Sequence, residues 1–401
     1  MHKVVVAGGS FAGLTAAFDL KRRLGSDAEV TVISKSDQFV FIPSLIWLVP
    51  GWRTESQISF PLAPSFHKKG IRFVHDAIAR IDPERNVVYT MSGEEPYDYL
   101  VVCTGPYLNF KAVPGTGPEG GFTQSVCNLP HAQIARDRWR EYLRDPGDIV
   151  VGATQGASCL GAAYEIALNQ THALVRAGVR DRVQVHFVTP EPYVAHFGLG
   201  GIEGGEEAVT RLLEKNRIHV HLNVSVEGIT PEKIRLSNGE EIGYRYAALI
   251  PPFLGVEAVR NSPGIGDAKG FIPVNDYYQH AQIDNIYAAG IAVALASPDP
   301  TPVPTGAPKT AYMSEIMARV AAHNIAARIR REKLSPVPIV DIQALCLLDA
   351  GNTGVFFMVD RLQRKTRRRT IVMPGPLMHV GKFMFEKYFM WKSRGGRTYL
   401  P

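Results

Sequence analysis

The sequence predicts an α/β protein with two Rossmann-like dinucleotide-binding domains of the FAD/NAD(P)-binding type, followed by a C-terminal segment at a membrane interface. Three observations support this fold class. A buried strand runs into a glycine turn and a helix at the N-terminus, a similar unit begins at Val150, and the C-terminal residues are both basic and aromatic. Strand–turn–helix units of this kind open the dinucleotide-binding domains of doubly wound folds.

The first unit consists of the apolar strand Val4–Ala7, a glycine turn, the amphipathic helix Leu14–Leu24 and the strand Glu29–Ser34. Gly8 and Gly13 match the G-x-G-x-x-G fingerprint, whereas Ser10 replaces its middle glycine. The free N–H groups at the helix start favour a diphosphate, although a turn without a ligand is the alternative. No acid for the ribose follows the second strand. The cofactor-binding residues predicted here are Gly8, Ser10, Phe11, Ala12, Gly13, Ser34 and Lys35.

Two later stretches belong to the same predicted domain. Tyr97–Gly105 is a buried strand that ends in Thr104 and Gly105, a pattern typical of flavin-binding folds in which this strand returns beneath the adenosine half of the cofactor. Cys103, within this stretch, is expected to be a core residue. Ile283–Ile291 is the second stretch, and Ile291 follows Gly290 where such folds usually place an aspartate for the ribityl chain.

Gly306 and Lys309 precede the long helix expected over Ala311–Arg331. A lysine beside a helix N-terminus can stabilise a reduced, anionic flavin ring, so both residues are predicted to bind the cofactor. A solvated lysine in the first helical turn is the alternative for Lys309.

The second unit, Val150–Glu165, keeps the strand, turn and helix but lacks the glycines of a nucleotide site. Thr154 and Ala157 stand where the fingerprint requires glycine, and no carboxylate ends the following strand, Gln184–Thr189. NAD(P)H binding is therefore disfavoured. Because Cys159 lies in this turn, we interpret the unit as a nucleotide loop converted into a thiol site.

Four scattered cysteines, Cys103, Cys127, Cys159 and Cys346, form neither a C-x-x-C pair nor a cluster with zinc spacing, so no metal site is predicted. The chain starts almost directly with strand Lys3–Ala7, from which we expect no signal peptide. Buried or catalytic thiols are then more plausible than structural disulfides.

Three further residues are candidate proton-handling groups. His131 and His196 are histidines, which titrate near neutrality, and Glu165 lies on the helix that Cys159 opens. Structural packing is the alternative for both histidines, and a surface position is the alternative for Glu165.

The predicted domains follow from these units. We expect residues 1–112 and 280–340 to form the FAD-binding domain, residues 113–279 to form the degenerate second domain with Cys159, and residues 341–401 to form a C-terminal membrane-binding region. The Pro- and Gly-rich stretch Pro114–Gly121 marks the first crossover between domains.

The C-terminal region carries the basic character of the chain. Arg361–Pro401 holds eleven Lys/Arg and one acidic residue, although the whole chain has a net charge of only +6. Arg361–Arg369 is expected to be a basic hairpin. Pro376–Trp391 mixes aromatic rings with Lys382, Lys387 and Lys392, a pattern that suits a helix in the bilayer interface with its lysines at the headgroups. A core-docked helix is the alternative, and no motif favours nucleic acid.

Together these residues identify a resemblance to the sulfide:quinone oxidoreductases, which spans essentially the whole chain. It rests on Ser125-Val126-Cys127, Gly156-Ala157-Ser158-Cys159, Glu191-Pro192-Tyr193 with His196, Gly290-Ile291-Ala292, Pro302–Thr310, Cys346 and Phe385-Glu386-Lys387-Tyr388-Phe389. Relatives often carry an aromatic residue directly after the last cysteine, whereas this chain has Leu347, and some relatives extend further beyond the Phe-Glu-Lys-Tyr-Phe segment.

The resemblance implies bound FAD and a redox pair formed by Cys159 and Cys346. Cys127 is the third cysteine of the family, where it either tethers the flavin covalently or helps to move sulfur, and both roles stay open. As a hypothesis, hydrosulfide attacks a sulfur that bridges Cys159 and Cys346, and two electrons pass through the flavin to a quinone. Phe357, Phe385 and Tyr388 are the candidate quinone-lining residues.

The expected partners are sulfide, a membrane quinone and the membrane surface, with a homo-oligomer as an open option and no nucleic acid. The expected location is the periphery of the cell membrane, as a monotopic protein, on a face left open. Three alternatives are an NADH:quinone oxidoreductase of the same fold, a flavocytochrome-type sulfide dehydrogenase and a flavin-binding membrane adaptor. The first requires an intact second glycine loop, and the second an export leader and a cytochrome partner.

Overall fold

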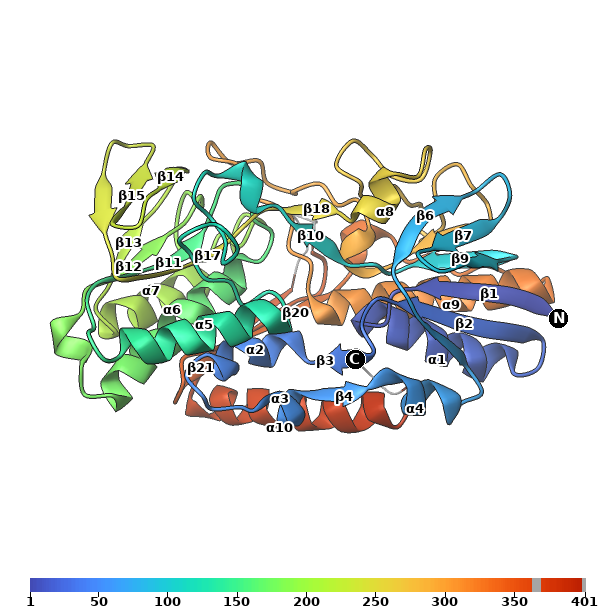
Figure 1. Ribbon diagram of the computed structural model, residues 1–401, viewed down its shortest axis with the longest axis horizontal. Helices are drawn as coiled ribbons and strands as arrows, with labels where there is room; N and C mark the ends of the chain where they lie inside the picture. Colours follow the sequence, from blue (N-terminus) through green and yellow to red (C-terminus); the bar gives the residue numbers. More distant parts are fainter. Residues whose placement is uncertain (363–368, 399–401) are drawn as a thin grey trace.

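Two parallel sheets form the centre of the computed structural model, which describes residues 1–362 and 369–398. The first sheet has the strand order β19-β9-β1-β2-β5 and lies on the right in Figure 1. Its strands are β1 (His2–Ala7), β2 (Ala28–Ser34), β5 (Arg72–His75), β9 (Tyr99–Val102) and β19 (Ile286–Ala288). All of its pairings are parallel, so the carboxyl ends of the strands meet at one edge.

Helix α1 (Phe11–Leu24) follows β1 and packs against the long helix α9 (Ala311–Arg330). The first helix therefore begins three residues before the expected Leu14, with Ser10 at its N-cap. Strand β19 lies nearly three hundred positions after β1 and completes the same sheet. The first sheet is therefore built from two separate parts of the sequence.

The second sheet has the order β13-β12-β11-β17 and lies on the left in Figure 1. Its strands are β11 (Ile149–Ala153), β12 (Val185–Val188), β13 (Ile218–His221) and β17 (Tyr246–Ile250). The helices of this half are α5 (Leu129–Tyr142), α6 (Leu160–Arg176) and α7 (Gly205–Lys215). The predicted pair of Rossmann-like units is confirmed, whereas the exact domain boundaries stay a prediction.

Smaller antiparallel sheets and short helices are attached to these two halves. The strands are β3 (Gln38–Val40), β4 (Ser59–Pro61), β6 (Ile78–Asp82), β7 (Val87–Thr90), β8 (Glu94–Pro96), β10 (Pro106–Leu108), β14 (Val226–Ile229), β15 (Lys233–Leu236), β16 (Glu241–Gly243) and β18 (Phe253–Gly255). The short helices are α2 (Leu45–Leu48), α3 (Glu55–Ile58), α4 (Leu62–His67) and α8 (Glu257–Arg260). Strands β10 and β18 pair across the two crossovers between the halves.

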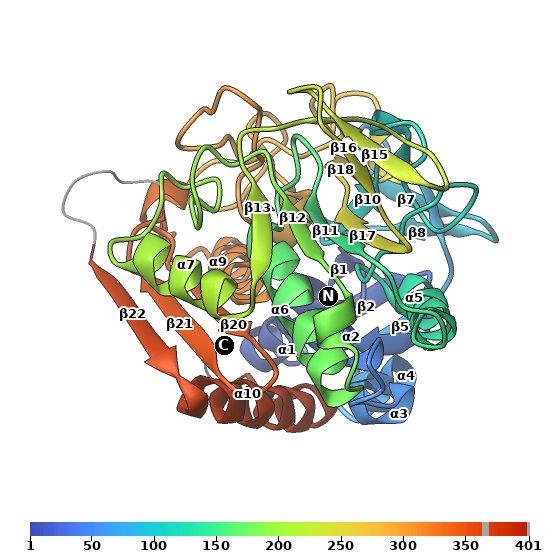
Figure 2. The same ribbon diagram turned by 90° about the vertical axis from the view of Figure 1, so that its left-hand side faces the viewer.

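The C-terminal region adds a three-stranded antiparallel sheet and a helix. Its elements are β20 (Ala344–Asp349), β21 (Gly354–Val359), β22 (Thr370–Gly375) and α10 (Pro376–Arg394). Figure 1 shows α10 in red along the lower edge, beneath both halves, and Figure 2 shows it at the same edge beside β20–β22. The expected basic hairpin falls largely on residues 363–368, which lie outside the described residues.

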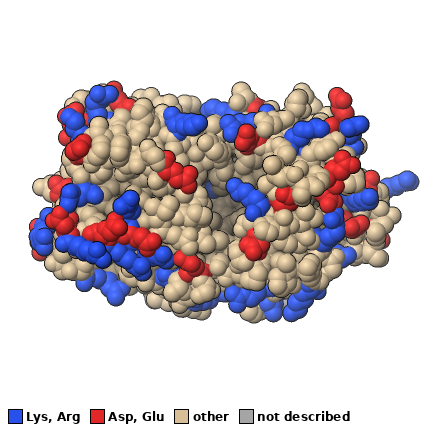
Figure 3. Space-filling model, in the orientation of Figure 1, with Lys and Arg blue, Asp and Glu red and all other residues tan. Residues whose placement is uncertain are grey.

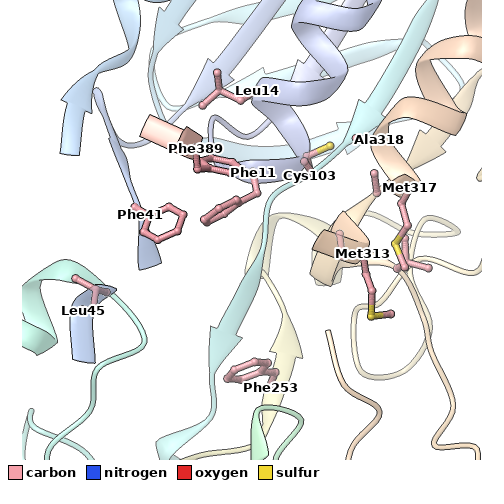
Figure 4. Packing of buried hydrophobic residues seen from close by; sticks show 14 of the residues in the cluster. Phe11, Leu14, Phe41, Leu45, Cys103, Phe253, Met313, Met317, Ala318 and Phe389 are labelled. Carbon is pink, nitrogen blue, oxygen red and sulfur yellow. The ribbon is translucent and has the colours of Figure 1, made fainter. Parts of the chain in front are cut away.

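Aromatic rings and ion pairs dock α10 onto the body. Phe389 packs on Phe11, Phe39 and Phe41, with ring centroids 4.9, 5.8 and 5.4 Å apart, as the close-up in Figure 4 shows for Phe11 and Phe41. Lys392 donates to buried Glu315 at 2.7 Å. The expectation that Lys382 and Lys392 lie at lipid headgroups is therefore wrong, because both side chains are buried in ion pairs.

The opposite side of α10 stays exposed and apolar. Leu377, Met384 and Trp391 expose 75%, 59% and 50% of their surface, although each is a large hydrophobic residue. Val380 and Phe383 on α10, and Ile371 and Met373 on β22, add to the same exposed set. These seven residues are called the apolar face below. Within the described residues, no helix is both long enough and apolar enough to span a bilayer.

Candidate active site

The N-terminal glycine turn forms a cradle that fits a dinucleotide. A side chain at Gly8 would place its Cβ 2.3 Å from the Cys103 carbonyl oxygen, and one at Gly13 would lie 1.9 Å from the carbonyl oxygen of Gly8. Gly8 also has a φ of +121°, which disfavours any residue with a side chain. Backbone therefore approaches backbone closely here, as a diphosphate-binding turn requires.

The start of α1 is available to an anion. The Ser10 side chain makes no capping hydrogen bond to any described residue, and the first turn of the helix carries no acidic residue. Phe11 and Ala12 are the first two residues of the helix, where main-chain N–H groups have no acceptor within the helix. The Phe11 ring packs in the aromatic cluster under α10. An uncapped helix N-terminus with no nearby carboxylate favours a phosphate group.

The other predicted cofactor residues lie along the same edge of the first sheet. Ser34 ends β2, Thr104 follows β9, and Gly290 follows β19 with a φ of +75°. The hydroxyl of Thr104 is buried, and among the described residues it has no hydrogen-bond partner. Such an orphaned polar atom in a glycine-lined cradle fits a bound polar ligand. The remaining members at this edge are Lys35, Gly105 and Ile291.

Lys309 lies close to the segment that follows β19, and its ammonium group binds main-chain oxygens there. Its Nζ donates to the carbonyl oxygens of Ile291 and Val293, each at 2.9 Å, and lies 3.5 Å from the centroid of the Phe271 ring. Burial lowers the pKa of Lys309 to about 7. The alternative of a solvated lysine is therefore wrong, and a role at the flavin stays a prediction.

The second glycine turn is covered by another part of the chain. Gly156 N donates to the Pro304 carbonyl at 2.6 Å, and Gly306 N donates to the Ala157 carbonyl at 2.9 Å. A Cβ at Gly306 would lie 2.3 Å from Ser158 Oγ. Gly306 thus packs against the second turn instead of the first, where a nicotinamide dinucleotide would otherwise place its diphosphate.

Three cysteines converge beside this covered turn. Cys159 is the N-cap residue of α6, and Cys346 lies in β20 with its sulfur 3.3 Å from the position of a Cβ at Gly161. Cys127 lies just before Asn128, the N-cap of α5. The charges of Cys127 and Cys346 both raise the pKa of Cys159, so the three thiols are near neighbours. All four cysteines, including the core residue Cys103, are free.

Burial dominates the titration of these thiols. It raises the pKa of Cys159 and of Cys346 to about 12, and that of Cys127 to about 11. For Cys346, the nearby Glu165 carboxylate raises the pKa further, whereas Lys382 lowers it. Lys382 is thus the cation that can stabilise a Cys346 thiolate.

Glu165 points inward, so the alternative of a surface glutamate is wrong. The residue is 7% exposed and accepts a hydrogen bond from Lys382 Nζ. The Asp349 main-chain N–H also donates to Glu165, at 3.2 Å. Burial raises the pKa of Glu165 to about 7, against the opposing effect of Lys382, which places a proton donor beside Cys346.

The two candidate histidines lie in different surroundings. His131 sits in the first turn of α5, bonded to its cap residue Asn128, and burial lowers its pKa. His196 is fully buried, and its Nε2 lies 2.9 Å from Asp299 Oδ2. The structure therefore keeps them on separate segments: His131 near Cys127, and His196 in the loop that packs on Gly306.

The loop around His196 is held by Glu191, a residue that sequence reasoning treated only as part of a motif. Glu191 is buried and accepts hydrogen bonds from the Tyr164 hydroxyl, the Thr189 hydroxyl and the Phe197 main-chain N–H. Ala195 and Phe197 have φ values of 60° and 54°, which are costly for residues with side chains. Glu191 stabilises this strained loop.

The candidate quinone-lining residues do not lie together. Cys346 and Phe357 are register partners on β20 and β21, and Phe357 is buried with its ring against Phe197. Successive residues of a strand point to opposite faces, so Leu347 points the other way, where its Cδ1 lies 3.6 Å from a Cβ built at Gly381 of α10.

Phe385 lies one turn beyond Gly381, and its ring is tilted toward Phe41 at 6.0 Å. Tyr388 is half-buried and contacts Trp391. Phe385 and Leu347 therefore lie on the side of β20 that faces α10, whereas Phe357 lies on the opposite side.

Comparison with known proteins defines the class first. The model of the pyridine nucleotide-disulphide oxidoreductase family matches residues 2–321. Sulfide-quinone reductase of Aquifex aeolicus is 38% identical over 98% of this chain and 91% of its own length. The X-ray structure of the Aquifex aeolicus sulfide:quinone oxidoreductase superposes with a TM-score of 0.94 at 36% identity, covering 99% of this chain and 92% of that one.

A mitochondrial sulfide:quinone oxidoreductase of Dictyostelium discoideum is 26% identical over 72% of this chain and 64% of its own length. The chain therefore belongs to the sulfide:quinone oxidoreductases within the pyridine nucleotide-disulphide oxidoreductase family. The expected resemblance is confirmed.

Proposed function

We propose that this protein oxidises sulfide to sulfane sulfur or polysulfide and transfers the two electrons to a membrane quinone through FAD. The observation that carries the proposal is the meeting of Cys159 and Cys346 at the start of α6, beside a second nucleotide turn that Pro304 and Gly306 cover. A thiol pair thus stands where a relative that uses NADH would hold its dinucleotide. Family membership supports the same reaction.

FAD is held by the first glycine turn and the adjoining strand ends. Ser10, Phe11 and Ala12 offer main-chain N–H groups to the diphosphate, and the Thr104 hydroxyl offers a polar contact. When bound, the flavin supplies the two-electron step between sulfide and quinone. The other proposed contacts are Gly8, Gly13, Ser34, Lys35, Gly105, Gly290, Ile291 and Lys309, whereas Gly306 packs on the second turn.

The cysteine pair performs the sulfur chemistry. Because burial keeps the thiols protonated, the nucleophile is hydrosulfide from solution. Hydrosulfide attacks the sulfur bridge, leaving a persulfide on Cys159 and a thiolate on Cys346 beside Lys382. When the bridge forms again with one more sulfur atom, the pair releases one proton and two electrons, which FAD at the first glycine turn would accept.

Cys127 is the third proposed member of the site. It lies just before the N-cap of α5 and close enough to Cys159 for their charges to interact. This position suits either of two roles, transfer of sulfur away from the pair or a covalent link to FAD. His131 and His196 are proposed to handle protons from sulfide, each from its own side of the cysteine cluster.

The quinone is proposed to bind between β20 and α10. Leu347, Phe385 and Tyr388 offer apolar contacts there, while Phe357 packs behind Cys346 on the other face of the strand pair. Glu165 and Lys382 lie close to Cys346 and can exchange protons with the quinone oxygens. This location lets a hydrophobic ring enter from the side of α10.

The apolar face of α10 and β22 is proposed to lie in the membrane interface. Its seven exposed hydrophobic residues flank exposed Lys387 and Arg394, a combination typical of interfacial segments. The protein would then be a monotopic peripheral protein of the cell membrane. A quinone dissolved in the bilayer would reach the site without leaving the hydrocarbon.

Flavin absorbance tests the proposed reaction directly. Purified protein with bound FAD is mixed with sulfide under argon, and decylubiquinone is added after the absorbance settles. We expect sulfide to bleach the flavin and the quinone to restore its colour. Protein that sulfide does not bleach would contradict the proposal, and bleaching that quinone cannot reverse would indicate a cytochrome acceptor instead.

A further inference from the structure

Proton balance requires an uptake path for the proposed reaction. Hydrosulfide carries one proton and gives up two electrons, whereas reduction of a quinone to a quinol consumes two electrons and two protons. Each turnover therefore takes one proton from bulk water. Since the proposed quinone site lies between β20 and the membrane-facing helix α10, this proton needs a chain of titratable groups leading to solvent.

Asp349 and His379 form a hydrogen-bonded pair between β20 and α10, where such a series of titratable groups is needed. Asp349 ends β20, and its side chain is 0% exposed, whereas the side chain of His379 on α10 is 35% exposed. His379 Nδ1 lies 2.6 Å from Asp349 Oδ1. His379 thus connects a fully buried carboxylate to the surface, next to the apolar face of α10.

Other contacts hold this carboxylate in position. Trp47 Nε1 donates to Asp349 Oδ2 at 2.8 Å, and Gly351 N donates to the same oxygen at 3.1 Å. The Trp47 ring also packs edge-on against His379, with centroids 5.8 Å apart. A buried carboxylate with this many donors keeps one orientation, and its other oxygen faces His379.

Glu165 and Lys382 form the inner end of this series of titratable groups. The main chain of Asp349 donates to the Glu165 carboxyl group, and the charge of Asp349 raises the pKa of Glu165. Asp349 therefore lies directly beside Glu165, and their carboxyl groups interact electrostatically. Glu165 and Lys382 in turn act on the Cys346 thiol.

Further charged groups face the pair from α6. His172 and Arg176 lie near it, and the pKa of His172 is lowered mainly by burial, then by Arg176 and, less strongly, by His379, while Asp349 opposes this shift. The pair is thus surrounded by Glu165, His172 and Arg176 from α6 and by Lys382 from α10. No part of the cysteine chemistry proposed above uses Asp349 or His379.

We propose that His379 and Asp349 form the proton-uptake path for quinone reduction, in which His379 takes a proton from the membrane surface and Asp349 passes it to Glu165 and Lys382. This inference rests on the proposed function. His379 and Asp349 act here through Glu165, so they are positioning and relay residues and do not touch the sulfur.

The test separates the two half-reactions of the holoenzyme. His379→Ala and Asp349→Asn are compared with the wild type and with His67→Ala, a control that removes an exposed histidine on α4. The flavin is reduced with sulfide in one set of samples and with dithionite in another. Its reoxidation by decylubiquinone is then followed with and without added imidazole.

We expect both variants to be reduced by sulfide at the wild-type rate, and to be reoxidised by quinone about tenfold more slowly, since general acid–base groups contribute about 10²–10⁴-fold. Imidazole should restore His379→Ala, because it can replace the missing proton carrier, but not Asp349→Asn. His67→Ala should match the wild type.

Two results would overturn the relay: a wild-type rate of reoxidation in His379→Ala, or a slow rate that imidazole leaves unchanged, which would indicate packing alone. Wild-type protein that dithionite reduces but sulfide does not would instead overturn the proposed function.

Discussion

At the scale of single residues, Cys159, Cys346 and Cys127 lie in surroundings that keep their thiols protonated. A buried thiol with a raised pKa is a poor nucleophile at neutral pH. Glu165 and Lys382 act on Cys346 in opposite directions, since the Glu165 carboxylate raises the pKa of this thiol further and Lys382 lowers it. Cys346 therefore differs from Cys159 in its charged neighbours, while burial raises the pKa of both thiols to about 12.

Replacement of either bridging cysteine tests the proposed sulfur bridge. Cys159→Ala and Cys346→Ala should each lower the rate of flavin reduction by sulfide by about a thousandfold or more, since the sulfur bridge cannot form. Stopped-flow absorbance measures the rate, and Cys103→Ala serves as the control because Cys103 is a core thiol. Retention of full turnover by either variant would rule out the bridge mechanism.

The titration of Glu165 predicts a pH dependence. Burial raises the pKa of this carboxyl group to about 7, so it carries a proton below that pH and loses it above. If Glu165 donates to the quinone, reoxidation of the reduced flavin should slow as the pH rises through 7. Glu165→Gln should be at least about tenfold slower at pH 6, with no such fall at higher pH.

The measurement is the rate of flavin reoxidation by decylubiquinone in protein reduced with dithionite, which separates this step from sulfide chemistry. Glu203→Gln is the control, because Glu203 is an exposed glutamate in the loop before α7. A Glu165→Gln variant with the wild-type pH profile would exclude Glu165 as the proton donor.

At the scale of elements, α10 has two different sides. Its inner side is pinned by Lys382 to Glu165, by Glu386 to Arg53 and Ser44, and by Lys392 to Glu315. Its outer side exposes apolar residues, with Leu377 at 75%. The docked helix that the sequence offered as an alternative describes the inner side, and the proposed interfacial helix would use the outer side.

Charge placed on the outer side should weaken membrane binding and leave the fold intact. The double variant Leu377→Glu/Met384→Glu should lose at least about tenfold in partitioning into liposomes, since burial of a charge costs about 2.5–3.5 kcal/mol at the bilayer centre and less in the interface. Sedimentation with vesicles measures the partitioning. Truncation of the whole helix is a poorer test, because it would also uncover Phe11, Phe39 and Phe41.

Met91→Glu is the matched control for this experiment. Met91 is 74% exposed and lies in the turn between β7 and β8, away from the apolar face. Its variant should bind vesicles as the wild type does. Equal binding by the double variant and the wild type would contradict the interfacial role of α10.

At the scale of the whole molecule, the two Rossmann-like halves share one architecture but differ in what their turns can hold. The first turn is an open cradle, and the second is packed against Pro304 and Gly306 of a segment that returns from the other half. Figure 3 shows a hollow near the middle of the molecule, between the two halves, with basic and acidic side chains close to its rim. The half-buried pair of Cys159 and Cys346 beside the covered turn suits a small electron donor such as the proposed sulfide.

NADH should not act as the electron donor. Addition of NADH to the oxidised protein is expected to leave the flavin absorbance unchanged, whereas sulfide bleaches it in the same cuvette. The reason is steric and chemical: the second turn lacks the glycines and the acid of a dinucleotide site, and main-chain hydrogen bonds already occupy its N–H groups. Rapid bleaching by NADH would contradict this assignment.

The sequence by itself determined the fold class and the family, and it predicted the glycine cradle and the thiol site. Local patterns suffice for these features, because a strand, a turn and a helix that are adjacent along the chain form each unit, and glycine positions report close backbone contacts. The substitution of Thr154 and Ala157 for glycine was enough to disfavour NAD(P)H.

Only the tertiary structure decided which distant residues share a site. The basic and aromatic pattern of the C-terminal region placed Lys382 at the membrane, yet the side chain is buried against Glu165, more than two hundred positions away. Likewise, nothing local linked Asp349 to His379 and Trp47. Charge pairing in the interior depends on how helices and strands pack in space, and periodicity along one element carries no information about its partners.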